Sequence, residues 1–320
     1  MSLPDTEMMT LLESNCFDST GIVTAYNGAR PLGHNVDVTS RRTFLKSSAL
    51  AAAIGKYAGA AQLKDIGVQL YTVRTVLPQK PAEVLNAIRA IGYTQIEGTL
   101  AGFDKIWPAV QASGLKPVSM HLDAAQVLKK SPEFDAVPDQ LAKYGFQYAV
   151  FPYVPPNDRG GPEVIKDIAG KLNWAAAKCH AAGLKFAYHN HAFEFAQADG
   201  APLMKVLLDN SDPKLVGLEL DCFWASVAGH DPAEMIESHK GRVILLHLKD
   251  KAEGTPVMFN ESVPKTAFKE VGHGTIDWPK VLRAAAAAGV AEYFVEQDQT
   301  PGDPLDSLRQ SYEYLSKLTF

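Results

Sequence analysis

Histidine and carboxylate side chains stand at or just beyond the ends of short apolar runs along this chain. They are Glu97, His121, His189, His191, Asp221, His247 and Glu296. Histidines and carboxylates are the usual ligands of divalent transition metals. Such an ion polarises a carbonyl oxygen, and a nearby carboxylate can then move the proton on the adjacent carbon. We therefore expect these side chains to meet in one metal-dependent site, provided that the fold brings them together.

The runs alternate with longer amphipathic segments from residue 64 onward, which is typical of parallel βα units. The expected strands are residues 66–71, 95–98, 116–121, 148–152, 185–190, 216–221, 243–248 and 293–297. The expected helices are 81–91, 103–113, 134–144, 162–182, 202–209, 232–239, 278–288 and 304–317. Several of these helices stop at a glycine, as Gly114 and Gly183 do, and the next strand follows directly.

Eight such repeats in about 255 residues predict a single-domain (β/α)8 TIM barrel over 61–320. In this fold catalytic groups lie at the carboxyl ends of the strands, which is where the histidines and carboxylates stand. A doubly wound open sheet is the alternative. It would require a glycine-rich phosphate turn after the first strand, and Tyr71-Thr72-Val73-Arg74 is not one.

Composition narrows the function classes. The 320 residues have a net charge of -5, so no basic excess indicates a nucleic-acid partner. The three cysteines, Cys16, Cys179 and Cys222, are scattered and predict neither a disulfide framework nor a cysteine zinc site. No apolar run reaches the roughly 18 residues of a membrane span. Whether the chain forms a homo-oligomer stays open.

Residues 1–60 are expected to be a leader outside the barrel. Residues 40–46 read SRRTFLK and are followed by an alanine-rich segment and by Ala58-Gly59-Ala60, a small-residue site of the type signal peptidases accept. The pattern resembles a twin-arginine export signal, with an unusually long stretch before the arginine pair. The resemblance implies export to the periplasm in the folded state, and we expect 1–60 to be disordered or loosely helical.

At its strand ends the sequence resembles the xylose isomerase-like TIM barrels, the sugar phosphate isomerase/epimerase superfamily, over about 64–318. The strings that carry the resemblance are GVQLY (67–71), IEG (96–98), YHNHAFEF (188–195), LD (220–221), HLKD (247–250), GHGTIDW (272–278) and VE (295–296). Each string is weakly specific by itself, but GVQLY and GHGTIDW together are more so.

The resemblance implies a divalent metal, Mn²⁺, Zn²⁺, Co²⁺ or Mg²⁺, held after the last four strands. Asp221, His247 and Glu296 match three of its ligands. The fourth, a glutamate in the family, is His189 here. Either His189 is the ligand or Glu194 reaches in from the following loop, and we favour Glu194, with His189 or His191 beside it.

Other candidates surround this metal set. Glu296, His189, His121 and Lys249 are candidate catalytic groups, although Lys249 alternatively forms an exterior ion pair with Asp250. Four further side chains are candidate substrate contacts, namely Tyr71, Glu97, His191 and Trp224. Phe223 is better explained by core packing. Residues 251–271 form a long loop of the kind that serves as a lid or an oligomer contact.

The resemblance implies a metal-dependent isomerase or epimerase that removes a proton next to the carbonyl of a free sugar. Because the paired glutamate is missing at position 189, a keto-sugar dehydratase or β-eliminating lyase is the alternative. A sugar-binding barrel without catalysis is a second alternative. A related class of abasic-site endonucleases would need a basic DNA-binding face, and the acidic balance opposes it. No phosphate pocket is visible, so we expect an unphosphorylated sugar.

Overall fold

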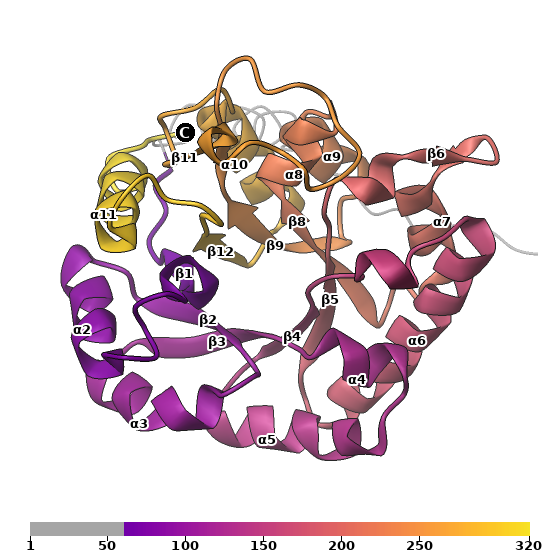
Figure 1. The fold of residues 1–320 in the computed structure, drawn as a ribbon, viewed down its shortest axis with the longest axis horizontal. Coiled ribbons are helices and arrows are strands. Elements are labelled where there is room, and N and C mark those ends of the chain that lie inside the picture. Colours follow the sequence, from indigo (N-terminus) through magenta and orange to yellow (C-terminus); the bar gives the residue numbers. More distant parts are fainter. Residues whose placement is uncertain (1–60) are drawn as a thin grey trace, which may run out of the picture. The chain divides into compact units, whose positions relative to one another are not determined.

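The computed structural model describes residues 61–320, and within them eight parallel strands form a closed barrel (Figure 1). The strands, in chain order, are β1 (Gly67–Gln69), β2 (Gln95–Thr99), β3 (Lys116–His121), β4 (Tyr148–Phe151), β5 (Lys185–His189), β8 (Val216–Asp221), β9 (Val243–Leu248) and β12 (Glu292–Val295). Each pairs with its neighbour along the chain, and β12 closes the ring on β1. The predicted (β/α)8 barrel is confirmed. The leader predicted for 1–60 lies outside the described residues.

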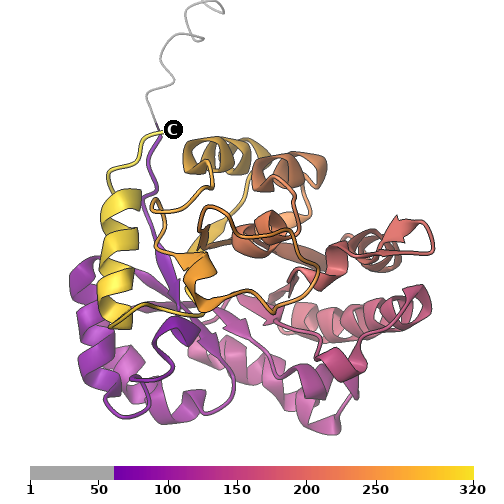
Figure 2. The ribbon, with the colours of Figure 1, turned by 45° about the horizontal axis from the view of Figure 1, so that its top comes forward.

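Helices surround the strands on the outside of the barrel (Figures 1 and 2). They are α2 (Pro81–Ile91), α3 (Phe103–Ser113), α4 (Ala124–Leu128), α5 (Val137–Tyr144), α6 (Pro162–Ala181), α7 (Leu203–Asn210), α8 (Cys222–Val227), α9 (Pro232–Ser238), α10 (Trp278–Ala288) and α11 (Pro304–Leu315). No helix within 61–320 is both long and apolar enough to cross a membrane.

Local sequence explains where a typical helix begins and ends. Helix α2 starts at Pro81, whose missing N–H costs nothing in the first turn, and buries Val84, Leu85 and Ile88 on one face. It stops at Gly92, whose φ of 130° and whose position against the ring of Tyr312 leave no room for a side chain. The next strand, β2, follows within three residues, which keeps βα units short.

The predicted pattern differs from the structure in several details, including the unpredicted helices α4 and α8, and two of the differences have a clear local cause. The helix predicted for 134–144 is a 3-10 helix, η3 (Pro132–Ala136), followed by α5. Pro138 cannot donate a backbone hydrogen bond, so one continuous α-helix does not form there. The first strand ends at Gln69, because the Gln69 side chain accepts from the Tyr71 N–H at 3.0 Å and caps the 3-10 helix η2 (Leu70–Val73).

Apolar side chains fill the barrel on both sides of the strands. Most of the core lies between the strands and the helices. A smaller cluster consists of strand residues alone, namely Val118, Tyr148, Val150, Ala187, Leu245 and Phe294. Ala187 and Leu245 stand two residues before His189 and His247, so they share the inward face with those histidines. The barrel interior is therefore apolar toward the amino ends of the strands and polar toward their carboxyl ends.

The two ends of the described chain meet. Ala61 and Phe320 exchange two backbone hydrogen bonds, of 2.9 and 3.0 Å. Figure 2 shows the carboxyl end beside the start of the described chain.

Candidate functional site

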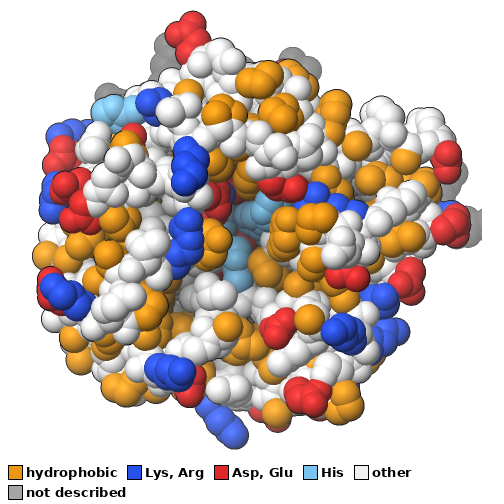
Figure 3. Space-filling model, viewed as in Figure 1, with side chains coloured by type: hydrophobic (Ala, Val, Ile, Leu, Met, Phe, Trp, Pro, Cys, Tyr) orange, Lys and Arg blue, Asp and Glu red, His pale blue; other side chains and the backbone are white. Residues whose placement is uncertain are grey.

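A cavity of about 620 Å³ opens at the carboxyl ends of the barrel strands. It is lined by Tyr71, Thr99, His121, Pro152, Tyr153, His189, His191, Trp224, Lys249, Glu261, Val263, Lys265, Phe268, Glu296, Asp298 and Gln299. Figure 3 shows histidine side chains at the bottom of the hollow at the centre of this face. The size is that of a small-molecule site. Four of the lining residues come from the long loop 251–271, which forms one wall of the cavity.

His189, Asp221, His247 and Glu296 converge at the floor of this cavity, and we call them the mouth group. One ligand atom from each lies within 4.8 Å of the others, and all four residues are buried. His247 Nδ1 is 3.1 Å from His189 Nε2 and 3.0 Å from Glu296 Oε2. The predicted meeting of Asp221, His247 and Glu296 is thus present, with His189 as the fourth member.

Hydrogen bonds to the surrounding backbone orient side chains of the mouth group for coordination. His189 Nδ1 is 3.2 Å from the carbonyl oxygen of Pro152, which leaves Nε2 turned toward the group. Asp221 uses Oδ1 to cap helix α8, accepting from the Trp224 N–H at 2.8 Å. Its Oδ2 is buried and accepts no hydrogen bond of proper geometry, although Lys249 Nζ lies 3.0 Å away. An acceptor of this kind, beside two imidazoles and a second carboxylate, fits a divalent metal.

Lys249 is buried at the edge of the mouth group rather than on the exterior. Its Nζ lies 3.0 Å from Asp221 Oδ2, 2.5 Å from Glu296 Oε2 and 2.8 Å from Asp298 Oδ2. Burial lowers the lysine pKa, but Asp221, Asp298 and Glu296 outweigh it and hold that pKa well above its usual value. Burial also raises the pKa of Glu296, but Lys249 and His247 outweigh it and keep the carboxyl ionised.

Asp250, the neighbour of Lys249, has a structural role that explains the GHGTIDW string. Its Oδ2 accepts from the N–H groups of Gly272 and Gly274 and from Trp278 Nε1, at 2.9, 3.2 and 2.7 Å. Its Oδ1 accepts from Lys251 and Ile276. The string thus wraps a buried carboxylate and fixes the end of β9, which carries His247 and is followed directly by Lys249.

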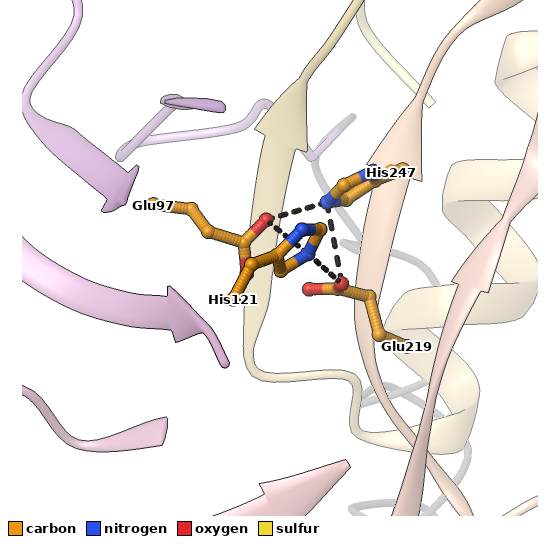
Figure 4. A group of neighbouring side chains, drawn as sticks. All are labelled: Glu97, His121, Glu219 and His247. Carbon is orange, nitrogen blue, oxygen red and sulfur yellow. Dashed lines mark hydrogen bonds and ion pairs between the residues drawn. The ribbon is translucent and has the colours of Figure 1, made fainter. Parts of the chain in front are cut away.

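A second cluster, the inner group, consists of Glu97, His121, Glu219 and His247 (Figure 4). His121 Nε2 lies 3.1 Å from Glu97 Oε2 and 2.9 Å from Glu219 Oε2. His247 Nε2 lies 2.6 and 3.3 Å from the same two oxygens. His247 thus belongs to both groups, with Nδ1 in the mouth group and Nε2 in the inner group.

Mutual charge sets the protonation of the inner group. Burial lowers the pKa of His121, but Glu97 and Glu219 outweigh it and raise that pKa to about 9. Burial raises the pKa of Glu219 to about 7, with Glu97 adding to the rise. Burial also raises the pKa of Glu97, but His121 and His247 outweigh it and hold that pKa well below its usual value. Near pH 7 the protonated His121 therefore offsets the charge of Glu97, while the Glu219 carboxyl is itself partly protonated.

Glu194 does not join either group. Its Oε1 accepts from the Tyr188 hydroxyl at 2.7 Å, and both oxygens accept from the His191 N–H at 3.0 Å. These hydrogen bonds hold the Glu194 carboxylate within the segment that follows β5. Of the two residues considered for the strand-5 position, the structure brings His189, and not Glu194, to Asp221, His247 and Glu296.

The predicted substrate contacts are divided between the cavity wall and the barrel interior. Tyr71, His191 and Trp224 line the cavity. The His191 and Trp224 rings stack with centroids 5.3 Å apart, and His191 Nδ1 and Trp224 Nε1 are buried without a hydrogen-bond partner. Glu97 instead lies inside the barrel as part of the inner group. Phe223 is fully buried and stacks on Phe268, in agreement with its expected packing role.

The residues of the site that the sequence did not single out include Glu219, Asp298 and Tyr153. Glu219 stands two positions before Asp221 on β8, so the period of two along a strand puts both on the inward face. That alternation was the available signal for Glu219. Asp298 follows β12, and Tyr153 follows β4, where neither stands in a recognisable motif.

Comparisons with known proteins agree with the fold. The sequence model described as "Xylose isomerase-like TIM barrel" matches residues 85–318. A sugar phosphate isomerase/epimerase from Parabacteroides distasonis superposes with a TM-score of 0.67 at 24% identity, covering 81% of this chain and 96% of that one. The IOLI protein, solved with a binding zinc atom, superposes with a TM-score of 0.61 at 16% identity, covering 78% and 95%.

Among curated proteins, the inosose dehydratase of Geobacillus kaustophilus is 27% identical over 157 residues, which are 46% of this chain and 50% of the relative. The chain therefore spans about half the length of the curated relatives it matches. The match of the family model covers most of the barrel and includes every member of the mouth and inner groups. This chain is accordingly a member of the xylose isomerase-like TIM barrel family.

Proposed function

We propose that this protein is a metal-dependent enzyme that removes the proton next to the carbonyl of a keto sugar or keto cyclitol and then expels water. The observation that carries the proposal is the contact of Glu296 Oε2 with Lys249 Nζ, at 2.5 Å, on the cavity wall. A carboxylate base and an ammonium acid thus stand side by side. That pair suits removal of a proton and of a hydroxyl group from adjacent carbons.

The protons balance within the pair. Glu296 accepts the proton as the C–H bond breaks, and the electrons move onto the carbonyl oxygen. As they return, the neighbouring C–O bond breaks, and Lys249 donates a proton to the departing hydroxide, which leaves as water. Glu296 then returns its proton to Lys249 across their contact.

His189, Asp221, His247 and Glu296 would hold the divalent metal. When bound, such an ion polarises the substrate carbonyl and stabilises the negative charge that develops on its oxygen.

Isomerisation or epimerisation begins with the same proton removal and differs in the later steps. Epimerisation requires a second acid or base that reprotonates the carbon from the opposite face. His189 replaces the glutamate that the family uses for this, and it is buried and hydrogen-bonded to a backbone carbonyl. Similarity to an inosose dehydratase adds support for elimination. The isomerase or epimerase expectation therefore becomes the second candidate.

The cavity wall suits a neutral polyhydroxyl compound. Its lysines are Lys249, already matched by three carboxylates, and Lys265. His191 and Trp224 offer unpartnered ring nitrogens for sugar hydroxyls. Burial, with His189 and Lys249, lowers the pKa of His191, so that its ring is neutral and adds no positive charge. We therefore propose an unphosphorylated substrate.

The decisive assay incubates the full, metal-loaded chain with free and phosphorylated keto sugars and keto cyclitols in D₂O. We expect an unsaturated dehydration product from an unphosphorylated substrate, and deuterium next to the carbonyl in recovered substrate. Glu296→Gln should remove both, with exposed Glu237→Gln as the matched control. An epimer without dehydration would establish the second candidate instead. Metal and sugar binding without exchange or product would reduce the protein to a sugar-binding barrel.

We also propose that the protein is exported, because residues 40–46 and the small-residue segment after them resemble a twin-arginine signal. Replacing Arg41 and Arg42 by lysine in the full gene should retain the protein in the cytoplasm. Periplasmic recovery of the double variant, comparable with that of the unaltered protein, would refute the proposal.

A further inference from the structure

We propose that the inner group is a second divalent-cation site, distinct from the mouth group and sharing His247 with it. Its members are Glu97, His121, Glu219 and His247, each of which offers one ligand atom within 4.8 Å of the others. The atoms that face one another are Glu97 Oε2, His121 Nε2, Glu219 Oε2 and His247 Nε2. Figure 4 shows these four side chains turned toward one point from different strands. Two imidazoles and two carboxylates form a donor set that suits zinc, cobalt or manganese.

The spacing of the donors is close to what an ion requires. The four measured contacts between imidazole nitrogens and carboxylate oxygens run from 2.6 to 3.3 Å. In a tetrahedral site with bonds of about 2.1 Å, neighbouring ligand atoms lie about 3.4 Å apart. The side chains would have to separate by less than about 1 Å, which is a change in side-chain torsions.

Neighbouring groups hold Glu97 in place. Gln69 Nε2 donates to Glu97 Oε2 at 2.8 Å, and Ser119 Oγ donates to Glu97 Oε1 at 2.5 Å. Such outer hydrogen bonds are typical of carboxylates that bind metals. Gln69 is itself fixed, because its Oε1 accepts from the backbone of Tyr71.

Glu219 supplies an independent observation. It is fully buried, and its Oε1 has no hydrogen-bond partner. A buried carboxylate with an unpartnered oxygen is costly unless a cation compensates it. The cation would reach it past His121, the member of the inner group that lines the cavity.

Sharing His247 sets the arrangement of the two sites. Nδ1 faces the mouth group and Nε2 faces the inner group. With a cation at each nitrogen, the ring would release its N–H protons to solvent and bridge the two ions as an imidazolate. The inner site uses no residue of the mouth group other than His247. This second site is therefore independent of the proposed reaction, which needs only the mouth group and Lys249.

The test titrates the metal-free, full-length protein with Zn²⁺ and counts bound equivalents by elemental analysis after removal of free metal. We expect two for the unaltered chain and for Glu237→Gln. We expect one for Glu219→Gln and one for Asp221→Asn, which lose the inner and the mouth site respectively. Ser119→Ala keeps every ligand and should weaken the second equivalent about 10- to 100-fold.

A second readout does not depend on activity. With Cu²⁺ at both sites, an electron paramagnetic resonance spectrum should show coupling across the shared imidazole in the unaltered protein and an uncoupled signal in Glu219→Gln. One equivalent in the unaltered protein, or two equivalents in a folded Glu219→Gln, would overturn the proposal. If Glu219→Gln does not fold, unchanged affinity for both equivalents in Ser119→Ala would overturn it as well. Each of these outcomes is independent of the dehydration assay, which tests the proposed reaction.

Discussion

Replacing Asp250 by asparagine should destabilise the barrel strongly although the shape of the side chain barely changes. Asp250 is fully buried, and its two oxygens accept from four backbone N–H groups and from Trp278 Nε1. An asparagine has one acceptor oxygen. Whichever way the amide turns, its NH₂ group faces two or three of those donors and leaves them unpaired.

The magnitude follows from those counts. Each buried donor left unpaired costs about 1–3 kcal/mol. With at least two donors lost, Asp250→Asn should lower the free energy of unfolding by about 4 kcal/mol. For a chain of this size that corresponds to a fall in Tm of about 8–16 °C.

Thermal and urea unfolding of the full-length protein would measure the loss. The matched control is Asp199→Asn at an exposed position with φ of 51°, a conformation that asparagine also tolerates. That variant should unfold like the unaltered protein. A loss below about 1 kcal/mol for Asp250→Asn would refute the argument that its hydrogen bonds hold the GHGTIDW segment.

Three further substitutions test other parts of the site. Lys249→Met should lower dehydration about 100-fold or more while deuterium exchange into the substrate persists, and an equal loss of both would remove Lys249 from the role of acid. Gly274→Ala should destabilise the protein by about 1–3 kcal/mol in urea unfolding, because the added Cβ would meet Asp250 Oδ1 at 2.2 Å, whereas Gly170→Ala, at an exposed helix position with open space, should not. Burial raises the pKa of Glu194 to about 7, so its stabilising contribution is complete below about pH 4 and is lost as the pH rises through 7. From pH 5 to pH 8, Glu194→Gln should therefore gain about 2–3 kcal/mol in free energy of unfolding relative to the unaltered chain, and a constant difference would contradict this.

The fold was predictable because strand and helix periods, with glycine stops such as Gly114, are local properties of the sequence. The meeting of Asp221, His247 and Glu296 followed from the same pattern, since the carboxyl ends of barrel strands converge. The position of Glu194 did not follow, because it depends on hydrogen bonds to Tyr188 and the His191 backbone that no periodicity reveals.

The charged side chains inside the barrel were harder to predict from the sequence than the fold. Glu219 stands inside the apolar run of β8, two residues before Asp221, and a charge inside such a run gives no local hint of the histidines that offset it from other strands. Lys249 beside Asp250 suggested a simple neighbouring ion pair. The alternation of a strand instead turns adjacent side chains to opposite faces, so Lys249 reaches the cavity while Asp250 binds the GHGTIDW segment.

The backbones of Ala61 and Phe320 are hydrogen-bonded to each other, so the two ends of the described chain lie side by side. A circular permutant is therefore accessible, in which a short linker joins these two residues and new ends are opened elsewhere. The exposed turn that precedes α6, around Gly161, is a suitable place for those ends. Any segment fused before Ala61 and any tag fused after Phe320 would emerge from the same spot, so a tag placed at an internal exposed loop would keep that spot clear.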